Sequence, residues 1–176
     1  MKKSVLLLFF AGCVATGIFG IGRKIPMNRV NDLGQREGYW RDSVGGGFVY
    51  DLYYKGGKKD GLYKRFYRNE LFLFGEYTAD NISGTWYMFG DEGELRCTID
   101  SIELNKDSIY TGYCRIFCKY KCYCADYYPS GAVKSEGYMV CDEDFMVDFW
   151  EIGEWKYYDE SGNLIKTKDY GDRRTP

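Results

Sequence analysis

The chain has 176 residues, a net charge of −2, an aromatic content of 19%, and 22 glycines against 3 prolines. This length fits one domain or a series of small repeated units. Tyrosine and phenylalanine favour strands and glycine serves turns, so the composition predicts an all-β fold and argues against disorder. The absence of histidine removes the commonest general base and the commonest metal ligand. We therefore expect a protein that is not an enzyme and carries no cofactor.

Residues 1–22 have the pattern of an export signal, with two lysines followed by an apolar run. The sequence Phe10-Ala11-Gly12-Cys13 is similar to a bacterial lipobox, in which Cys13 would be acylated. Ordinary cleavage near Gly20 or Gly22 is a second interpretation. The third is an uncleaved anchor helix, because the apolar run would span about 28 Å as a helix. All three predict an exported protein of the cell envelope, either a membrane-anchored lipoprotein or periplasmic, with residues 23–33 as a linker.

A glycine–aromatic motif recurs along the chain with a shift of 23 residues. Its successive copies are Gly34, Gly38 and Trp40, then Gly57, Gly61 and Tyr63, then Gly84 and Trp86 without the first glycine. Gly153 and Trp155 repeat the offset further along. A period of this length holds two strands of about five to six residues and two turns. Residues 53–67 are therefore interpreted as strand, tight turn and strand, with lysines that belong first to the turn.

A second motif consists of aromatic residues, a short polar turn, a glycine, one further residue and an aliphatic residue. Its glycines are Gly93, Gly131 and Gly162. A hairpin loop built on a type I turn needs a positive φ just before the returning strand, and glycine adopts it without steric cost. These three segments therefore predict β-hairpins.

Together the motifs predict an elongated, twisted antiparallel sheet of consecutive β-hairpin repeats of about 23 residues over 34–172. A single hairpin is marginally stable, so neighbouring units must pair edge to edge. Residues 97–124 do not follow the motif and are expected to form a divergent cysteine-rich insert. The signal or anchor helix would precede this domain.

The motif-bearing segments "NDLGQREGYW", "YYKGGKKDGLYKRFY" and "GEWKYYDESGNLIKTKDY" resemble the MORN-repeat variant proteins. The resemblance covers residues 31–95 and 124–170 but not 97–123. It implies a twisted sheet of consecutive antiparallel hairpins with no catalytic residues. Many such proteins in the Bacteroidetes and their relatives are exported, and some are described as YwqK-type antitoxins.

Six cysteines follow Cys13, four of them in one run. They are Cys114, Cys118, Cys122 and Cys124, flanked by Cys97 and Cys141. If the run forms a strand, its four even-numbered cysteines share a face. Disulfides suit an exported protein, whereas buried free thiols acting as small core residues remain an equal alternative. A zinc site within the run is disfavoured, because Cys114 and Cys118 would lie about 13 Å apart. We expect no metal.

Charge is distributed unevenly along the chain. Residues 23–68 contain eleven Lys and Arg against five Asp and Glu, whereas 136–160 contain nine acids and one lysine. The basic segment suggests a docking surface for a charged protein or for anionic headgroups. The candidate contact residues are Lys58, Lys59, Lys64, Arg65 and Arg68. The alternative is that these charges only protect exposed strands from pairing with other chains. The acidic segment 141–151 lacks the spaced ligands of a calcium loop and is interpreted as a polar hairpin loop.

These observations favour a non-catalytic, envelope-associated repeat scaffold that binds a protein or an anionic lipid surface. The alternative is an antitoxin that neutralises a partner toxin by protein–protein contact. Nucleic acid is a poor partner for an exported chain of negative net charge.

Overall fold

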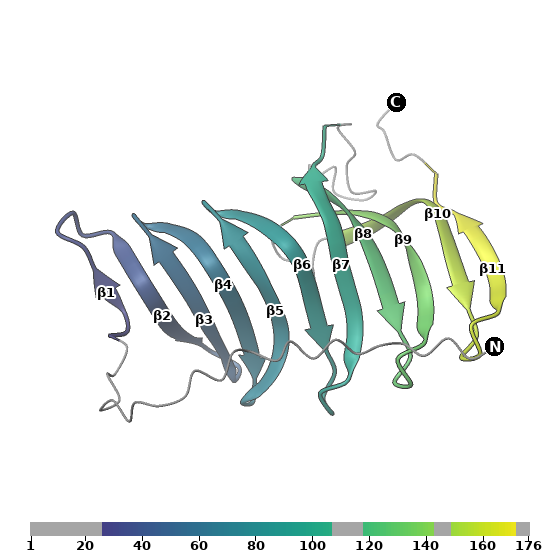
Figure 1. Cartoon of the computed structure of the whole chain (residues 1–176), viewed down its shortest axis with the longest axis horizontal. Coiled ribbons are helices and arrows are strands. Elements are labelled where there is room, and N and C mark those ends of the chain that lie inside the picture. The colour runs from purple at the N-terminus through teal and green to yellow at the C-terminus, as the bar shows by residue number, and fades with distance from the viewer. Residues whose placement is uncertain (1–25, 107–117, 143–148, 172–176) are drawn as a thin grey trace, which may run out of the picture.

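The computed structural model describes residues 26–106, 118–142 and 149–171. Over these ranges the chain forms one antiparallel sheet of 11 strands arranged in chain order, so the predicted all-β class is confirmed (Figure 1). The strands are β1 (Arg29–Val30), β2 (Arg36–Val44), β3 (Phe48–Lys55), β4 (Lys58–Tyr67), β5 (Glu70–Thr78), β6 (Asn81–Phe89), β7 (Leu95–Leu104), β8 (Tyr120–Tyr127), β9 (Val133–Cys141), β10 (Phe149–Tyr158) and β11 (Leu164–Asp169). The predicted signal segment 1–22, with Cys13, and also Cys114 lie outside the described residues.

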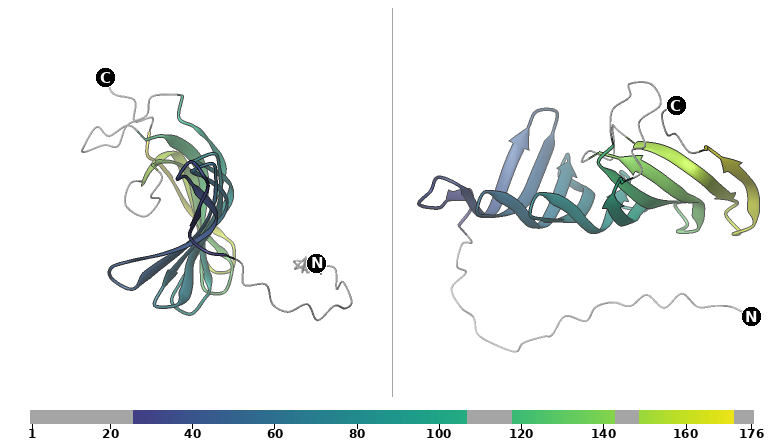
Figure 2. Two further views of the ribbon diagram at one scale, coloured as in Figure 1. Left: turned by 90° about the vertical axis from the view of Figure 1, so that its left-hand side faces the viewer. Right: turned by 90° about the horizontal axis from the view of Figure 1, so that it is seen from above.

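The sheet is a single twisted and curved layer across the described residues, open at β1 and at β11 (Figure 2). It begins at Arg29, inside the segment 23–33 that the sequence assigned to a linker. Residues 97–104 and 120–124, from the segment interpreted as an insert, are part of strands β7 and β8 and continue the same order of pairing. Within the described part of the chain, no helix is long and apolar enough to cross a membrane.

Two-residue turns join the central strands. Gly56 and Gly57 connect β3 to β4 with φ values of 57° and 83°, so the predicted strand–turn–strand arrangement of 53–67 is confirmed. The turns at 68–69 and 79–80 also have positive φ at both positions. Such turns match the right-handed twist of the flanking strands, which favours tight hairpins.

Longer turns use the second glycine motif as predicted. In each, the glycine has positive φ, and its N–H donates to the carbonyl three residues earlier: Gly93 to Gly90, Gly131 to Tyr128 and Gly162 to Asp159. Gly34 closes the turn between β1 and β2 in the same way. The turn chemistry was therefore readable from the sequence.

The glycine of the Gly-x-aromatic motif lies inside a strand. Gly38, Gly61, Gly84 and Gly153 have positive φ on β2, β4, β6 and β10. The pairing register shifts beside three of them, at Gly61, Gly84 and Gly153. An extra residue of this kind bends a strand and increases its twist. These glycines therefore help to curve the layer.

One face of the sheet carries the main core, and we call it the core face. Its buried members are Leu52, Tyr63, Leu73, Tyr77, Ile82, Trp86, Cys97, Ile99, Tyr120, Cys122, Cys124, Met139, Cys141 and Trp155. Trp86 and Trp155 are only 1% and 4% exposed, although no second layer covers them in the described structure. Each indole N–H donates to a backbone carbonyl, of Ser83 and Tyr138 respectively.

The two indoles reach this burial by lying on glycines of neighbouring strands. A Cβ added to Gly75 of β5 would overlap the ring of Trp86, and one at Gly137 of β9 would lie 2.5 Å from ring atoms of Trp155. Neither glycine has a positive φ, so both are required for space and not for backbone conformation. A flat ring against bare backbone takes the place of a second packing layer.

We predict that Gly75→Ala destabilises the protein by about 1–3 kcal/mol, because the new methyl group displaces the Trp86 ring from its position against the backbone of residue 75. The midpoint of urea unfolding, followed by tryptophan fluorescence, measures this loss. Gly45→Ala is the matched control, since Gly45 has no heavy atom within 4 Å of the added Cβ and no positive φ. Equal stability of the two variants would show that the ring does not need the glycine.

Candidate functional site

A row of paired residues runs across the core face. Aromatic side chains recur along this row, and the recurrence is interrupted at β8. In this row Tyr63 lies opposite Gly75, and Trp86 lies opposite Ile99. Ile99 in turn faces Cys124 of β8, which faces Gly137. In this row β4, β6 and β10 place the rings of Tyr63, Trp86 and Trp155, whereas β8 places the small thiol of Cys124. The sheet therefore lacks an aromatic ring at this point.

A pocket of about 350 Å³ lies where the ring is missing. Its apolar wall includes Met88, Cys97, Cys124, Met139 and Trp155. Its polar lining is Asp126, Lys134, Ser135 and Glu151. Sulfur atoms and opposite charges thus share one hollow on the core face.

The cysteines beside this pocket form two close pairs. The Sγ atoms of Cys97 and Cys124 are 3.2 Å apart, and those of Cys122 and Cys141 are 3.5 Å apart. All four are buried and none is in a disulfide. The sequence left disulfides and buried thiols open at these four positions, and which of the two they form stays a prediction.

Cys118 is placed differently from Cys122 and Cys124. It precedes β8 and packs with Val140 and Ile152 in a second cluster. Val140 lies between Met139 and Cys141, whose side chains belong to the core face, so it points to the other side. The sequence placed Cys118 on the face of Cys122 and Cys124 only if the run forms one strand. That condition is not met at Cys118, because the strand begins at Tyr120.

The environment of Cys97 and Cys122 keeps these two thiols protonated. The hydrogen bond with Cys124, burial and the nearby Asp126 carboxylate together raise the pKa of Cys97 far above its usual range. The hydrogen bond with Cys141 and burial do the same for the pKa of Cys122. Both groups are therefore neutral thiols at physiological pH.

One group of side chains here has the spacing of metal ligands. The ligand atoms of Cys97, Cys124 and Asp126 all lie within 4.8 Å of one another. The carboxylate of Asp126 also accepts a hydrogen bond of 2.8 Å from the hydroxyl of Ser135. The sequence did not reveal this group, because Cys97 reaches it from β7 and the other two residues from β8.

The structure does not gather the basic residues predicted from the sequence into one patch. Lys58 begins β4 and Arg68 follows its other end. Lys64 lies opposite Asp51, on the face away from the core. Arg65 is on the core face, with its guanidinium 4.6 Å from the ring centroid of Phe48. Lys59 also turns to the core face, 4.6 Å from the ring centroid of Tyr77.

A different basic and aromatic cluster lies on the core face of β2 and β3. The Arg36 guanidinium carbon is 4.5 Å from the ring centroid of Trp40, and an Arg36 N–H donates to the Tyr54 hydroxyl at 2.9 Å. The Arg36 side chain remains 45% exposed and forms an ion pair of 3.3 Å with Asp42. We call Arg36, Trp40 and Tyr54 the β2–β3 cluster. Arg36 and Trp40 are four residues apart on a strand, and this even spacing was the available sequence signal.

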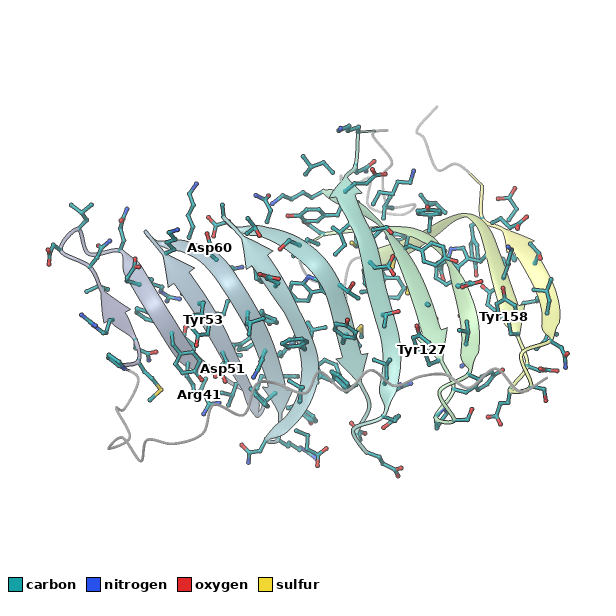
Figure 3. All side chains as sticks on the ribbon, in the orientation of Figure 1. Arg41, Asp51, Tyr53, Asp60, Tyr127 and Tyr158 are labelled. Carbon is teal, nitrogen blue, oxygen red and sulfur yellow. The ribbon has the colours of Figure 1, made fainter. Side chains whose placement is uncertain are left out.

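The opposite face of the same hairpin is fixed by a charged pair. The Arg41 guanidinium donates twice to the Asp51 carboxylate, at 2.6 and 2.8 Å, and Figure 3 shows the two side chains close together near Tyr53. Burial, followed by a hydrogen bond with Asp51, raises the pKa of Tyr39 to about 12. This face is therefore locked by internal contacts, whereas the β2–β3 cluster keeps an exposed cation.

Comparison with protein families, with curated proteins and with solved structures gives no match for this chain. The resemblance to MORN-repeat variant proteins stays a prediction.

We predict that Cys97 is alkylated by iodoacetamide at pH 8 at least about tenfold more slowly in the native protein than in urea, because each unit of raised pKa lowers the thiolate fraction tenfold. Peptide mapping by mass spectrometry measures the rate at this residue. Since the raised pKa keeps the thiol neutral, the native rate should still be low at pH 9. A rate equal to that of the unfolded chain would contradict the buried pair.

Proposed function

We propose that this protein is a non-catalytic repeat scaffold of the cell envelope that binds a protein partner through the β2–β3 cluster. The observation that carries the proposal is an exposed arginine stacked on aromatic rings, on a face that no second layer covers in the described structure. Tyrosine, tryptophan and arginine are the residues most enriched in the energetic centres of protein interfaces.

The distribution of charge supports a protein partner over a lipid surface. A membrane presents a plane of anionic groups, and a basic protein meets it best with one continuous patch. Here Lys58 and Arg68 lie at opposite ends of β4, while Lys64 and Arg65 lie on opposite faces. A shaped protein surface with an acidic group can instead use the exposed cation of Arg36 together with the rings of Trp40 and Tyr54.

The pattern of residues 1–22 supports export, and the positive-φ glycines on alternate strands support the repeat assignment. An extended sheet of repeated hairpins offers a broad surface without a reactive centre, which suits scaffolding. We propose the envelope as its location on these grounds.

The test compares two charge reversals in the full chain. Arg36→Glu changes the β2–β3 cluster, whereas Lys58→Glu changes an exposed lysine at the turn end of β4. Immobilised protein captures partners from solubilised envelopes, and the captured protein is purified and its Kd is measured. We expect Arg36→Glu to weaken binding at least about tenfold, the loss of a moderate hot spot, and Lys58→Glu to leave it unchanged.

Vesicles with anionic lipid provide the competing measurement. Equal losses of partner binding with both reversals, or tight vesicle binding that both reversals abolish, would show a general electrostatic surface and contradict the proposal. Circular dichroism of both variants checks that the sheet is intact.

A further inference from the structure

We infer that Cys97, Cys124 and Asp126 form a binding site for a borderline-soft divalent cation of the Zn²⁺ class, with its open coordination position facing the pocket on the core face. This site lies on β7 and β8, away from the β2–β3 cluster, and does not depend on the proposed scaffold function.

The geometry of the three side chains is close to that of a metal site. Cys97 lies directly opposite Asp126 in the β7–β8 pairing, and Cys124 is two residues from Asp126 on the same face. Their ligand atoms already lie within 4.8 Å of one another. In a tetrahedral site with Zn–S bonds of about 2.3 Å, two sulfurs lie about 3.8 Å apart. The two sulfurs here are 3.2 Å apart, so small rotations would admit the ion.

The pairing register favours an ion over a disulfide. Cys97 faces Asp126 and Cys124 faces Ile99, so the two cysteines are diagonal neighbours. The Cα atoms of diagonal neighbours are about 7–8 Å apart in antiparallel sheets, beyond the usual limit of about 6.8 Å for a disulfide. A metal ion can bridge two cysteines at this distance, because two metal–sulfur bonds replace the single sulfur–sulfur bond of a disulfide.

The surroundings match what such an ion requires. Two thiolates and a carboxylate are ligands that zinc accepts, and three protein ligands leave a fourth position for water or a ligand. Ser135 is buried and donates to Asp126, and such an outer hydrogen bond orients a ligating carboxylate. The three anionic ligands and one divalent ion sum to one negative charge. The pocket lining adds one cation, Lys134, and one further carboxyl group, Glu151.

Binding is coupled to proton release. The divalent ion forms two metal–sulfur bonds and one metal–oxygen bond, and the two S–H bonds break with both protons passing to solvent. Because the ion binds thiolates and not thiols, affinity should rise with pH, up to about 100-fold per unit while both thiols are protonated. The other titratable or charged groups that line the pocket or interact with these cysteines are Cys122, Lys134, Glu151, Tyr157 and Asp100.

The test uses the full chain, purified under reducing conditions and freed of metal with a chelator. Co²⁺ is added first, because its thiolate complexes have a charge-transfer absorption that reports sulfur ligation, and Zn²⁺ is then used to displace it. We expect a Co²⁺ signal that saturates at one ion per chain for this site, tighter binding at higher pH, and displacement by Zn²⁺.

Variants locate the ligands. Cys97→Ser should remove the signal, and Asp126→Asn should weaken binding. Ser135→Ala, which alters only the outer hydrogen bond, should weaken it by about 10–100-fold. Cys141→Ser is the matched control, because Cys122 and Cys141 are equally buried and 3.5 Å apart but are not part of the ligand group. It should leave the signal unchanged.

Three outcomes would overturn the inference. They are a Co²⁺ signal without thiolate character, an equal loss in Cys141→Ser and Cys97→Ser, or a Cys97–Cys124 disulfide found by mass spectrometry in protein purified without reductant. Asp126→Asn and Ser135→Ala keep the test decisive even if the serine variants fold poorly, since both leave the thiols in place.

Discussion

The packing of an indole ring on a bare glycine is the interaction on which the rest of this structure depends. A sheet one layer thick has no opposing layer to bury its side chains, so the apolar surface must be buried within the layer itself. Trp86 on Gly75 and Trp155 on Gly137 do this by lying flat across the neighbouring strand. Glycine supplies the space, and the large apolar area of the ring supplies the stabilisation.

The same constraint explains why the pocket lies where it does. The row of rings needs an aromatic residue on each alternate strand, and β8 places Cys124 there instead. The smaller side chain leaves a hollow next to Trp155 and brings sulfur atoms to its wall. A departure from the packing pattern thus brings two thiols and a carboxylate together on the core face. In the β2–β3 cluster, on the same face, the aromatic rings of Trp40 and Tyr54 are present, and the exposed Arg36 packs against them.

Local chemistry made the turns predictable from the sequence. The pairing register of the strands, and the face of the sheet on which each side chain lies, were not predictable. Gly93, Gly131 and Gly162 occupy the turn positions expected of them, because a positive φ is a local requirement. Gly61 and Gly153 were recognised in the sequence only as positions of a repeated motif. They lie at irregularities within strands, which depend on the neighbouring strand. Long-range pairing also brings Cys97 to Asp126, and no pattern within either segment indicates that pairing. Lys64 and Arg65 are adjacent in sequence and therefore point to opposite faces, so a charge-rich segment did not become a patch.

The proton NMR spectrum reports the packing of indole on glycine directly, because a ring lying on a glycine shifts the Hα signals of that residue. We expect Gly75 and Gly137 to have Hα resonances far upfield of the other glycines. Trp86→Leu should restore the Gly75 signals alone, and Trp155→Leu those of Gly137 alone. Ordinary Hα shifts at both glycines in the folded wild-type protein would show that the indole rings do not lie on these glycines.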